Sequence, residues 1–217
     1  MRYERKYPFK KDYLENVFFR LKAAGYQRKY PRRSIFSIYY DTEELQLFIQ
    51  SEAGIDKRLK KRIRWYSSDN ILTLENKIKN AELGYKILEK DFSKFSSKFT
   101  IDFKNPIDKN KYEILLPTVL DQIYFPQVAV SYNREYLISI CGNIRVTIDF
   151  DIKFAKVNSS SKNSVNNWIP SNEEVMEIKY DENDDYYCSN LINNIVDQLG
   201  LTTRRFSKYC NAISFLF

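Results

Sequence analysis

The sequence predicts an α+β protein, mostly an antiparallel β-barrel with a charged lumen and several helices packed outside. Most of the chain alternates charged and apolar residues with the period of two that is typical of β-strands, and helical spacing is confined to short segments. The charged strand faces repeat one unit, Glu-x-Lys, at Glu4/Lys6, Glu75/Lys77 and Glu177/Lys179. A solvated sheet surface has no reason to repeat this spacing, whereas a barrel whose charged faces point inward does.

The strand pattern is clearest in five segments, which are residues 2–7, 62–66, 71–79, 144–151 and 175–180. In the second of these, Arg62 and Arg64 share one face, and Ile63 and Trp65 share the other. We expect the apolar faces to form the core and the charged faces to line the barrel.

The first two helices are predicted from the spacing of apolar residues and from the residues at their ends. Residues 11–24 carry a helical stripe that ends at Gly25, a residue typical of a helix C-terminus. A second helix carries residues 45–48, and Asp41 or Thr42 can cap its N-terminus.

The remaining helices are predicted near residues 112–124 and over residues 186–199. The first of these starts or is interrupted at Pro117, and the second carries one apolar stripe and ends before Gly200. Residues 157–167, rich in Ser and Asn, predict an exposed loop between two strands.

The length, the N-terminus and the cysteines indicate one ordinary cytoplasmic domain. The chain has 217 residues, enough to bury a sizeable core, and its first residues form no apolar leader. It contains no run of about 18 apolar residues, so we expect no integral membrane segment. Its three cysteines lack the short paired spacing of a zinc or redox site, so we expect them to be reduced.

The charged composition restricts the chemistry. The chain has 35 Lys and Arg against 28 Asp and Glu, a net charge of +7, and no histidine. The absence of histidine excludes Ser/His/Asp and Cys/His catalysis and the zinc sites that need an imidazole ligand. The positive charge favours an anionic partner, either nucleic acid, a membrane surface or phosphate-rich small molecules.

A charged barrel lumen suits phosphate groups. Basic residues two apart on a strand lie roughly 7 Å apart on one face, a spacing that can bind successive phosphates. Carboxylates between them can hold Mg²⁺ or Mn²⁺ together with phosphate oxygens. Such a site can catalyse phosphoryl transfer through positioning and charge neutralisation, without histidine.

A series of motifs, in order, resembles a known family. The motifs are RYERKY at 2–7, IYYDT at 38–42, KRIRWY at 61–66, LENKIK at 74–79, VSYNRE at 130–135, RVTID at 145–149, MEIK at 176–179 and RFSKY at 205–209. The series resembles the VTC domain, the polyphosphate polymerase branch of the triphosphate tunnel metalloenzymes, which also include the CYTH proteins. The resemblance covers nearly the whole chain. It implies a single tunnel domain over residues 1–217, of the type that stands alone in prokaryotes.

The resemblance implies that the γ-phosphate of ATP is transferred to inorganic polyphosphate in the tunnel, with Mn²⁺ or Mg²⁺. By motif position, the basic residues expected to bind phosphate and support catalysis are Lys6, Arg62, Arg64, Lys77, Arg134, Arg145 and Lys208. Lys179 and Ser207 are further expected substrate-binding residues. Glu177 is the expected metal ligand, and Glu4 and Glu75 either assist the metal or order the basic groups.

Several alternatives stay open. The first acid of the superfamily's Glu-x-Glu-x-Lys signature is replaced by Arg2, which is similar to the VTC branch and unlike CYTH triphosphatases. A tripolyphosphatase or nucleoside triphosphatase in the same tunnel, and a non-catalytic polyanion-binding module, are the competing functions. Residues 204–208 can also form an exposed nucleic-acid patch, but the apolar residues that follow favour a buried end and no nucleic-acid partner.

Individual acids also have structural interpretations. Asp149 lies on the same face as Arg145, so an ion pair is as good an explanation as metal binding. For Glu177, the competing interpretation is a salt bridge to a lysine of the lumen.

Overall fold

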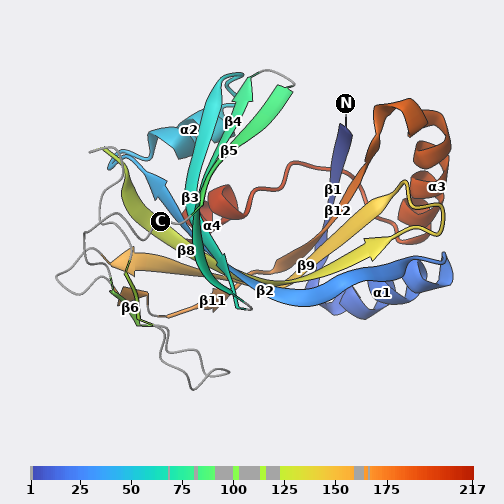
Figure 1. Ribbon diagram of the computed structural model, residues 1–217, viewed down its shortest axis with the longest axis horizontal. Coiled ribbons are helices and arrows are strands. Elements are labelled where there is room, and N and C mark those ends of the chain that lie inside the picture. Colours follow the sequence, from blue (N-terminus) through green and yellow to red (C-terminus); the bar gives the residue numbers. More distant parts are fainter. Residues whose placement is uncertain are drawn as a thin grey trace. The chain divides into compact units, whose positions relative to one another are not determined.

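The computed structural model describes residues 2–67, 69–80, 83–90, 100–102, 113–115, 123–158, 164–165 and 167–217. Its elements are β1 (Arg2–Lys10), η1 (Lys11–Tyr13), α1 (Leu14–Ala23), β2 (Gln27–Asp41), α2 (Gln46–Glu52), β3 (Arg58–Tyr66), β4 (Asp69–Asn80), β5 (Leu83–Lys90), β6 (Thr100–Asp102), β7 (Glu113–Leu115), β8 (Phe125–Ile138), β9 (Arg145–Asn158), β10 (Ser164–Val165), β11 (Ile169–Pro170), β12 (Glu173–Asp181), η3 (Glu182–Asp184), α3 (Asp185–Gln198) and α4 (Lys208–Leu216) (Figure 1).

The main sheet has the strand order β1-β12-β9-β8-β2-β3-β4-β5, with β10 and β11 paired to β9 and with β6 and β7 forming a separate pair. The registers of β1 with β12, β12 with β9, and β2 through β5 are all antiparallel. This confirms the predicted α+β, mostly antiparallel fold class. Among the residues described, β1 and β5 are the two ends of the ladder.

The chain divides into two compact units. Unit 1 contains residues 1–34, 132–152 and 170–206, and unit 2 contains residues 35–131, 153–169 and 207–217. The long strands β2, β8 and β9 therefore each contribute residues to both units. One domain over residues 1–217 stays a prediction.

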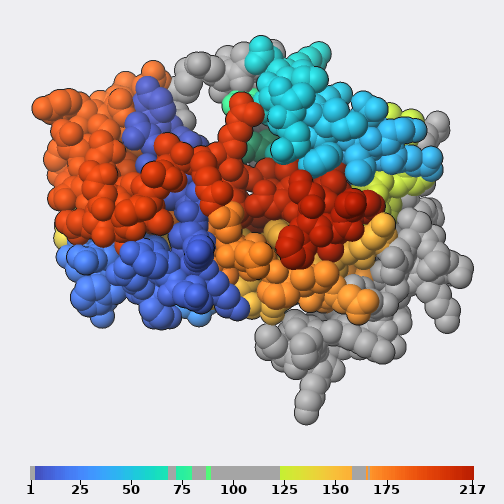
Figure 2. Space-filling view, turned by 180° about the vertical axis from the view of Figure 1, so that it is seen from behind, coloured from blue at the N-terminus to red at the C-terminus, as the bar shows by residue number. Residues whose placement is uncertain are grey.

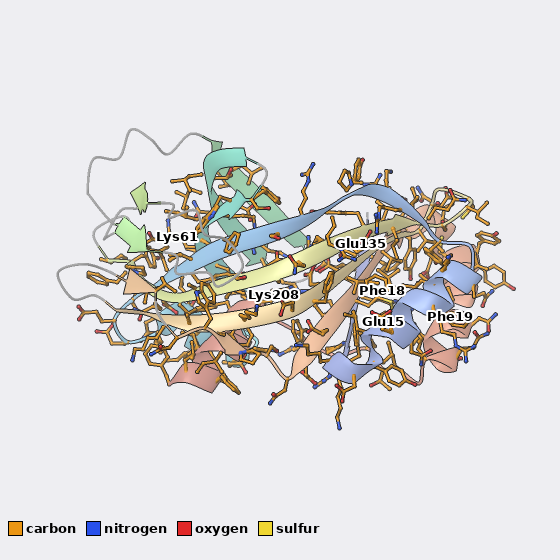
Figure 3. All side chains as sticks on the ribbon, turned by 90° about the horizontal axis from the view of Figure 1, so that it is seen from below. Glu15, Phe18, Phe19, Lys61, Glu135 and Lys208 are labelled. Carbon is orange, nitrogen blue, oxygen red and sulfur yellow. The ribbon has the colours of Figure 1, made fainter. Side chains whose placement is uncertain are left out.

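The core of unit 1 lies between helices and the apolar faces of strands. Val17 and Leu21 of α1 and Ile192 of α3 pack in one buried cluster with residues of β1, β9 and β12. On α1, Phe18 points toward the strands, where its ring meets Phe150 edge-on at 5.9 Å (Figure 3). Helix α1 therefore buries its apolar stripe and leaves its opposite face exposed, as its sequence pattern predicts.

The core of unit 2 includes the apolar faces of β2, β3 and β4. Ile38, Ile63 and Leu74 belong to one buried cluster there. The surface of α4 lies beside that of α2 (dark red and light blue in Figure 2). Tyr209 and Ile213 of α4 are buried, so the end of the chain is part of the fold.

The predicted strand phases are confirmed. On β12, Met176 and Ile178 enter the core, while Glu177 and Lys179 lie on the opposite face. Parts of the charged face are nevertheless buried, as shown by Arg64 on β3, which is only 7% exposed. A simple solvated sheet surface does not explain that burial.

Helix ends follow the predicted chemistry. Asp41 accepts hydrogen bonds from the backbone N–H groups of Leu47 (2.8 Å) and Phe48 (2.9 Å), and Thr42 Oγ1 accepts one from Gln46 N–H (3.1 Å). These bonds satisfy N–H groups in the first turn of α2. Gly25 follows α1 with φ of +81°, a conformation that favours glycine.

Two sequence predictions need correction. Residues 113–115, at the start of the helix predicted near residues 112–124, form strand β7 instead, because pairing with β6 overrides the local spacing. Residues 112 and 116–122 of that predicted helix lie outside the described residues, and residues 123–124 are not helical. The predicted loop 157–167 contains paired strand residues, because Val165 lies opposite Val157 and both are buried.

Helix α4 was not predicted, although burial of the chain end was. No helix in the described part of the chain is long and apolar enough to cross a membrane.

One buried acid in unit 1 lies on the core face of β12. Glu174 is 1% exposed, and its Oε1 accepts a hydrogen bond from the backbone N–H of Asp151 (3.0 Å). Its Oε2 is buried with no hydrogen-bond partner among the described residues. Burial raises the pKa of Glu174 to about 7, although the N–H groups of Asp151 and Ile152 and the charge of Lys11 oppose this shift.

Candidate functional site

A row of basic side chains runs along one face of β3 in unit 2. Lys60, Arg62 and Arg64 alternate along the strand and therefore share a face. The register places Tyr39 of β2 opposite Arg62 on one side and Glu75 of β4 opposite it on the other. The predicted residue Lys77 lies opposite Lys60, which the sequence prediction did not include.

Glu75 pairs with two arginines of this row. The Glu75 residue is 4% exposed, and its Oε2 accepts a hydrogen bond from Arg62 Nε at 2.6 Å. Arg64 Nη1 lies 3.6 Å from the same oxygen. Glu75 is therefore ion-paired with two predicted phosphate-binding residues, and its role, either assisting a metal or ordering the basic groups, stays a prediction.

Tyr39 is the second residue that the sequence prediction missed. Its hydroxyl accepts a hydrogen bond from Arg62 Nη1 (2.9 Å), and its ring stacks on that of Tyr209 with centroids 5.1 Å apart. Burial opposes ionisation of the Tyr39 hydroxyl, but the charges of Arg62, Arg64 and Lys208 outweigh it and lower the pKa. Strand phase could have identified Tyr39, because it shares a face with the basic row.

The N-terminus of α4 brings two more predicted residues to the row. Lys60 Nζ donates to Ser207 Oγ (2.8 Å), and Ser207 caps α4 by accepting from the backbone N–H of Cys210 (3.3 Å). Lys208 is the first residue of α4, and it is labelled in Figure 3. We call Lys60, Arg62, Arg64 and Lys208, with Tyr39 and Glu75, the cationic cluster.

Unit 1 contains a second set of charged residues, on β1 and β12. Lys179 Nζ lies 2.7 Å from Glu177 Oε1 and 3.2 Å from Glu4 Oε2, so it bridges the two acids. Lys6 Nζ lies 3.4 Å from Glu4 Oε1 and donates to the backbone carbonyl of Phe206 (3.1 Å). Burial opposes the charged form of Lys179, but Glu177 and Glu4 outweigh it and raise the pKa.

Two predicted arginines of unit 1 differ in their surroundings. Arg134 forms a two-pronged ion pair with Asp149, in which Nη2 donates to Oδ2 at 2.7 Å. Burial opposes the charge of Arg134, but Asp149 outweighs it and raises the pKa well above the ordinary value. The partner of Asp149 is therefore Arg134, whereas Arg145 is exposed and makes no hydrogen bond or ion pair with a described residue.

Glu177 and Glu4 are the acids of unit 1 that could hold a divalent ion. The Oε2 atom of Glu177 forms no hydrogen bond with a described residue. The hydroxyl of its register partner Thr147 is buried and has no hydrogen-bond partner in the described part of the chain. Among the residues described, no three acids, cysteines or histidines gather into a complete metal site. Mg²⁺ commonly binds one or two carboxylates together with substrate phosphates, so Glu177 and Glu4 suit it.

Comparison with known proteins shows one family across the chain. A family model described as the VTC domain matches residues 1–217. No curated protein matches the chain in sequence.

Solved structures show the same fold at low sequence identity. Two proteins described as a "putative adenylate cyclase" are similar: one from Vibrio parahaemolyticus (14% identity, TM-score 0.54, covering 98% of this chain and 97% of that one) and one from Bacillus halodurans (14%, 0.53, 99% and 96%). A Hippeastrum protein is also similar (12%, 0.52, 100% and 97%), and it is described as having a dominant triphosphatase activity.

Proposed function

Because the chain belongs to the VTC domain family, we propose that it is a metal-dependent phosphotransferase that moves the γ-phosphate of ATP onto inorganic polyphosphate. The observation that supports this most is the cationic cluster. Glu75 pairs with two of its four basic residues, Arg62 and Arg64, and Arg64 is almost fully buried. A buried guanidinium needs acceptors for its N–H groups, and phosphate oxygens are acceptors that suit it.

The basic residues would act by holding phosphate oxygens. Arginine donates two parallel hydrogen bonds to a phosphate, and Glu75 fixes the direction of Arg62 and Arg64. We assign the same phosphate-binding role to Lys77 and Lys208 in unit 2, and to Lys6, Arg134, Arg145 and Lys179 in unit 1. Ser207 holds Lys60 and caps α4.

The reaction needs no strong base. An ionised terminal oxygen of the polyphosphate forms a bond to the γ-phosphorus, the bond from that phosphorus to the bridging oxygen breaks, and ADP leaves with the electron pair. Glu177, with Glu4, would hold Mn²⁺ or Mg²⁺, which neutralises charge on phosphate oxygens when bound. We place the reaction in the cytoplasm, where ATP is available.

A triphosphatase is the second candidate function, in which water replaces polyphosphate as the acceptor. The described activity of the similar Hippeastrum protein favours it. The products distinguish the two candidates, since the polymerase makes long chains and ADP, whereas the hydrolase releases phosphate.

Purified protein incubated with ATP or tripolyphosphate and Mn²⁺ or Mg²⁺ tests both candidates, with products followed by ³¹P NMR. Glu177→Gln keeps the size of the side chain and removes its charge, so we expect turnover to fall at least a hundredfold with the fold retained. Glu15→Gln, at an exposed acid of α1, is the matched control and should keep full activity (Figure 3). If the native protein binds polyphosphate but never turns over ATP or tripolyphosphate with any metal, both candidates fail, and a non-catalytic binding module remains.

A further inference from the structure

Tyr39 of β2 lies beside Arg62 in the cationic cluster, on the sheet face that carries the basic row. It is 5% exposed and is the register partner of Arg62. Its ring is fixed from one side by Tyr209, which stacks on it and whose own hydroxyl donates to Asp41. The position of the Tyr39 hydroxyl is therefore set by packing.

The hydroxyl hydrogen of Tyr39 has no acceptor among the described residues. Its oxygen already accepts the hydrogen bond from Arg62 Nη1, and no described backbone or side-chain atom accepts a bond from it. Buried hydroxyl groups are normally satisfied as donors as well as acceptors.

The charged neighbours of this hydroxyl cannot serve as acceptors. Arg62, Arg64 and Lys208 act on it electrostatically, and all three side chains are hydrogen-bond donors only. A donor that is surrounded by further donors suits an anion with several acceptor oxygens.

We propose that Tyr39 is a substrate-binding residue whose hydroxyl donates a hydrogen bond to a phosphate oxygen of the bound substrate, beside Arg62. The ligand class in this inference rests on the proposed function. The lowered pKa of Tyr39 supports it, because a more acidic hydroxyl is a stronger donor to an oxyanion.

The first test is Tyr39→Phe, which keeps the ring that stacks on Tyr209 and removes only the hydroxyl. Binding of tripolyphosphate is measured by titration calorimetry without divalent metal, so that the ligand is not consumed. Hydrogen bonds to charged groups contribute enough for the variant to bind about tenfold to a hundredfold more weakly. Tyr40→Phe is the matched control, because it removes a hydroxyl from the other face of the same strand, and it should bind like the native protein.

A second variant separates direct contact from an effect through Arg62. Arg62→Lys keeps the positive charge and removes the guanidinium that donates to Tyr39. If Tyr39 touches phosphate, Tyr39→Phe still weakens binding several-fold in the Arg62→Lys background. If Tyr39 acts only by holding Arg62, the additional loss disappears, and the inference is wrong.

A spectroscopic measurement covers the case in which Tyr39→Phe does not fold. With 3-fluorotyrosine at position 39, we expect saturating tripolyphosphate to shift the ¹⁹F resonance, and an unmoved resonance overturns the inference. Native protein that does not bind tripolyphosphate overturns the proposed function as well. Native binding that equals that of a folded Tyr39→Phe variant overturns the role of Tyr39 alone.

Discussion

Replacing the buried acid Glu174 by glutamine should change how stability depends on pH. Its pKa is raised from 4.5 to about 7 by burial, a difference of 2.5 units. At ~1.4 kcal/mol per unit, ionised Glu174 costs the folded state about 3 kcal/mol. Because the folded pKa is the higher one, native stability falls as pH rises from 4.5 to about 7, and then levels off with respect to this group.

Glu174→Gln has no such charge to bury. The glutamine carbonyl can still accept the hydrogen bond from Asp151 N–H, so the variant resembles the protonated acid. Relative to the native protein, we expect its free energy of unfolding to gain ~2–3 kcal/mol between pH 5 and pH 8. The other acids titrate in both proteins, so their contributions to the free energy of unfolding cancel in the difference.

Urea unfolding at a series of pH values measures this difference. Glu15→Gln removes an exposed carboxylate, and we expect it to change stability by less than about 0.5 kcal/mol at each pH. If the free energies of unfolding of the native protein and of Glu174→Gln change with pH in parallel, the pKa of Glu174 is not raised.

Two further predictions concern other buried or reactive groups. Asp41→Ala removes the acceptor for two N–H groups of α2 and for the Tyr209 hydroxyl, so we expect a loss of ~2–4 kcal/mol in urea unfolding; a loss under about 1 kcal/mol would contradict this. The hydrogen bond with Ser139 lowers the pKa of the exposed Cys141 thiol, while burial raises the pKa of Cys188 and Cys210. Iodoacetamide at neutral pH should therefore modify Cys141 first, as peptide mass spectrometry can show, and equal rates at all three would disprove it.

The strand faces could be predicted from the sequence because they depend on local alternation. Arg62 and Arg64 point to one face of β3, and Ile63 and Trp65 point to the other face, whichever strand pairs with β3. The capping of α2 by Asp41 was equally local, since the cap lies within seven residues of its donors.

The partners of charged groups could not be predicted in the same way. The sequence places Asp149 near Arg145 on one strand, but pairing with the preceding strand, β8, brings Arg134 to it. Lys60 contacts Ser207, 147 residues away, and no local pattern contains that information. Helix α4 was missed because its nine residues carry few polar positions to mark a helical stripe.

The bond from Tyr209 to Asp41 joins residues 168 positions apart, and it has a consequence for biosynthesis. On the ribosome, the hairpin of β3 and β4 can form as soon as it emerges, because its strands are neighbours in the chain. The buried oxygens of Asp41 receive the Tyr209 hydroxyl only after α4 has been translated. We therefore expect nascent chains that stop short of α4 to remain protease-sensitive, and to depend on chaperones until α4 emerges from the ribosome.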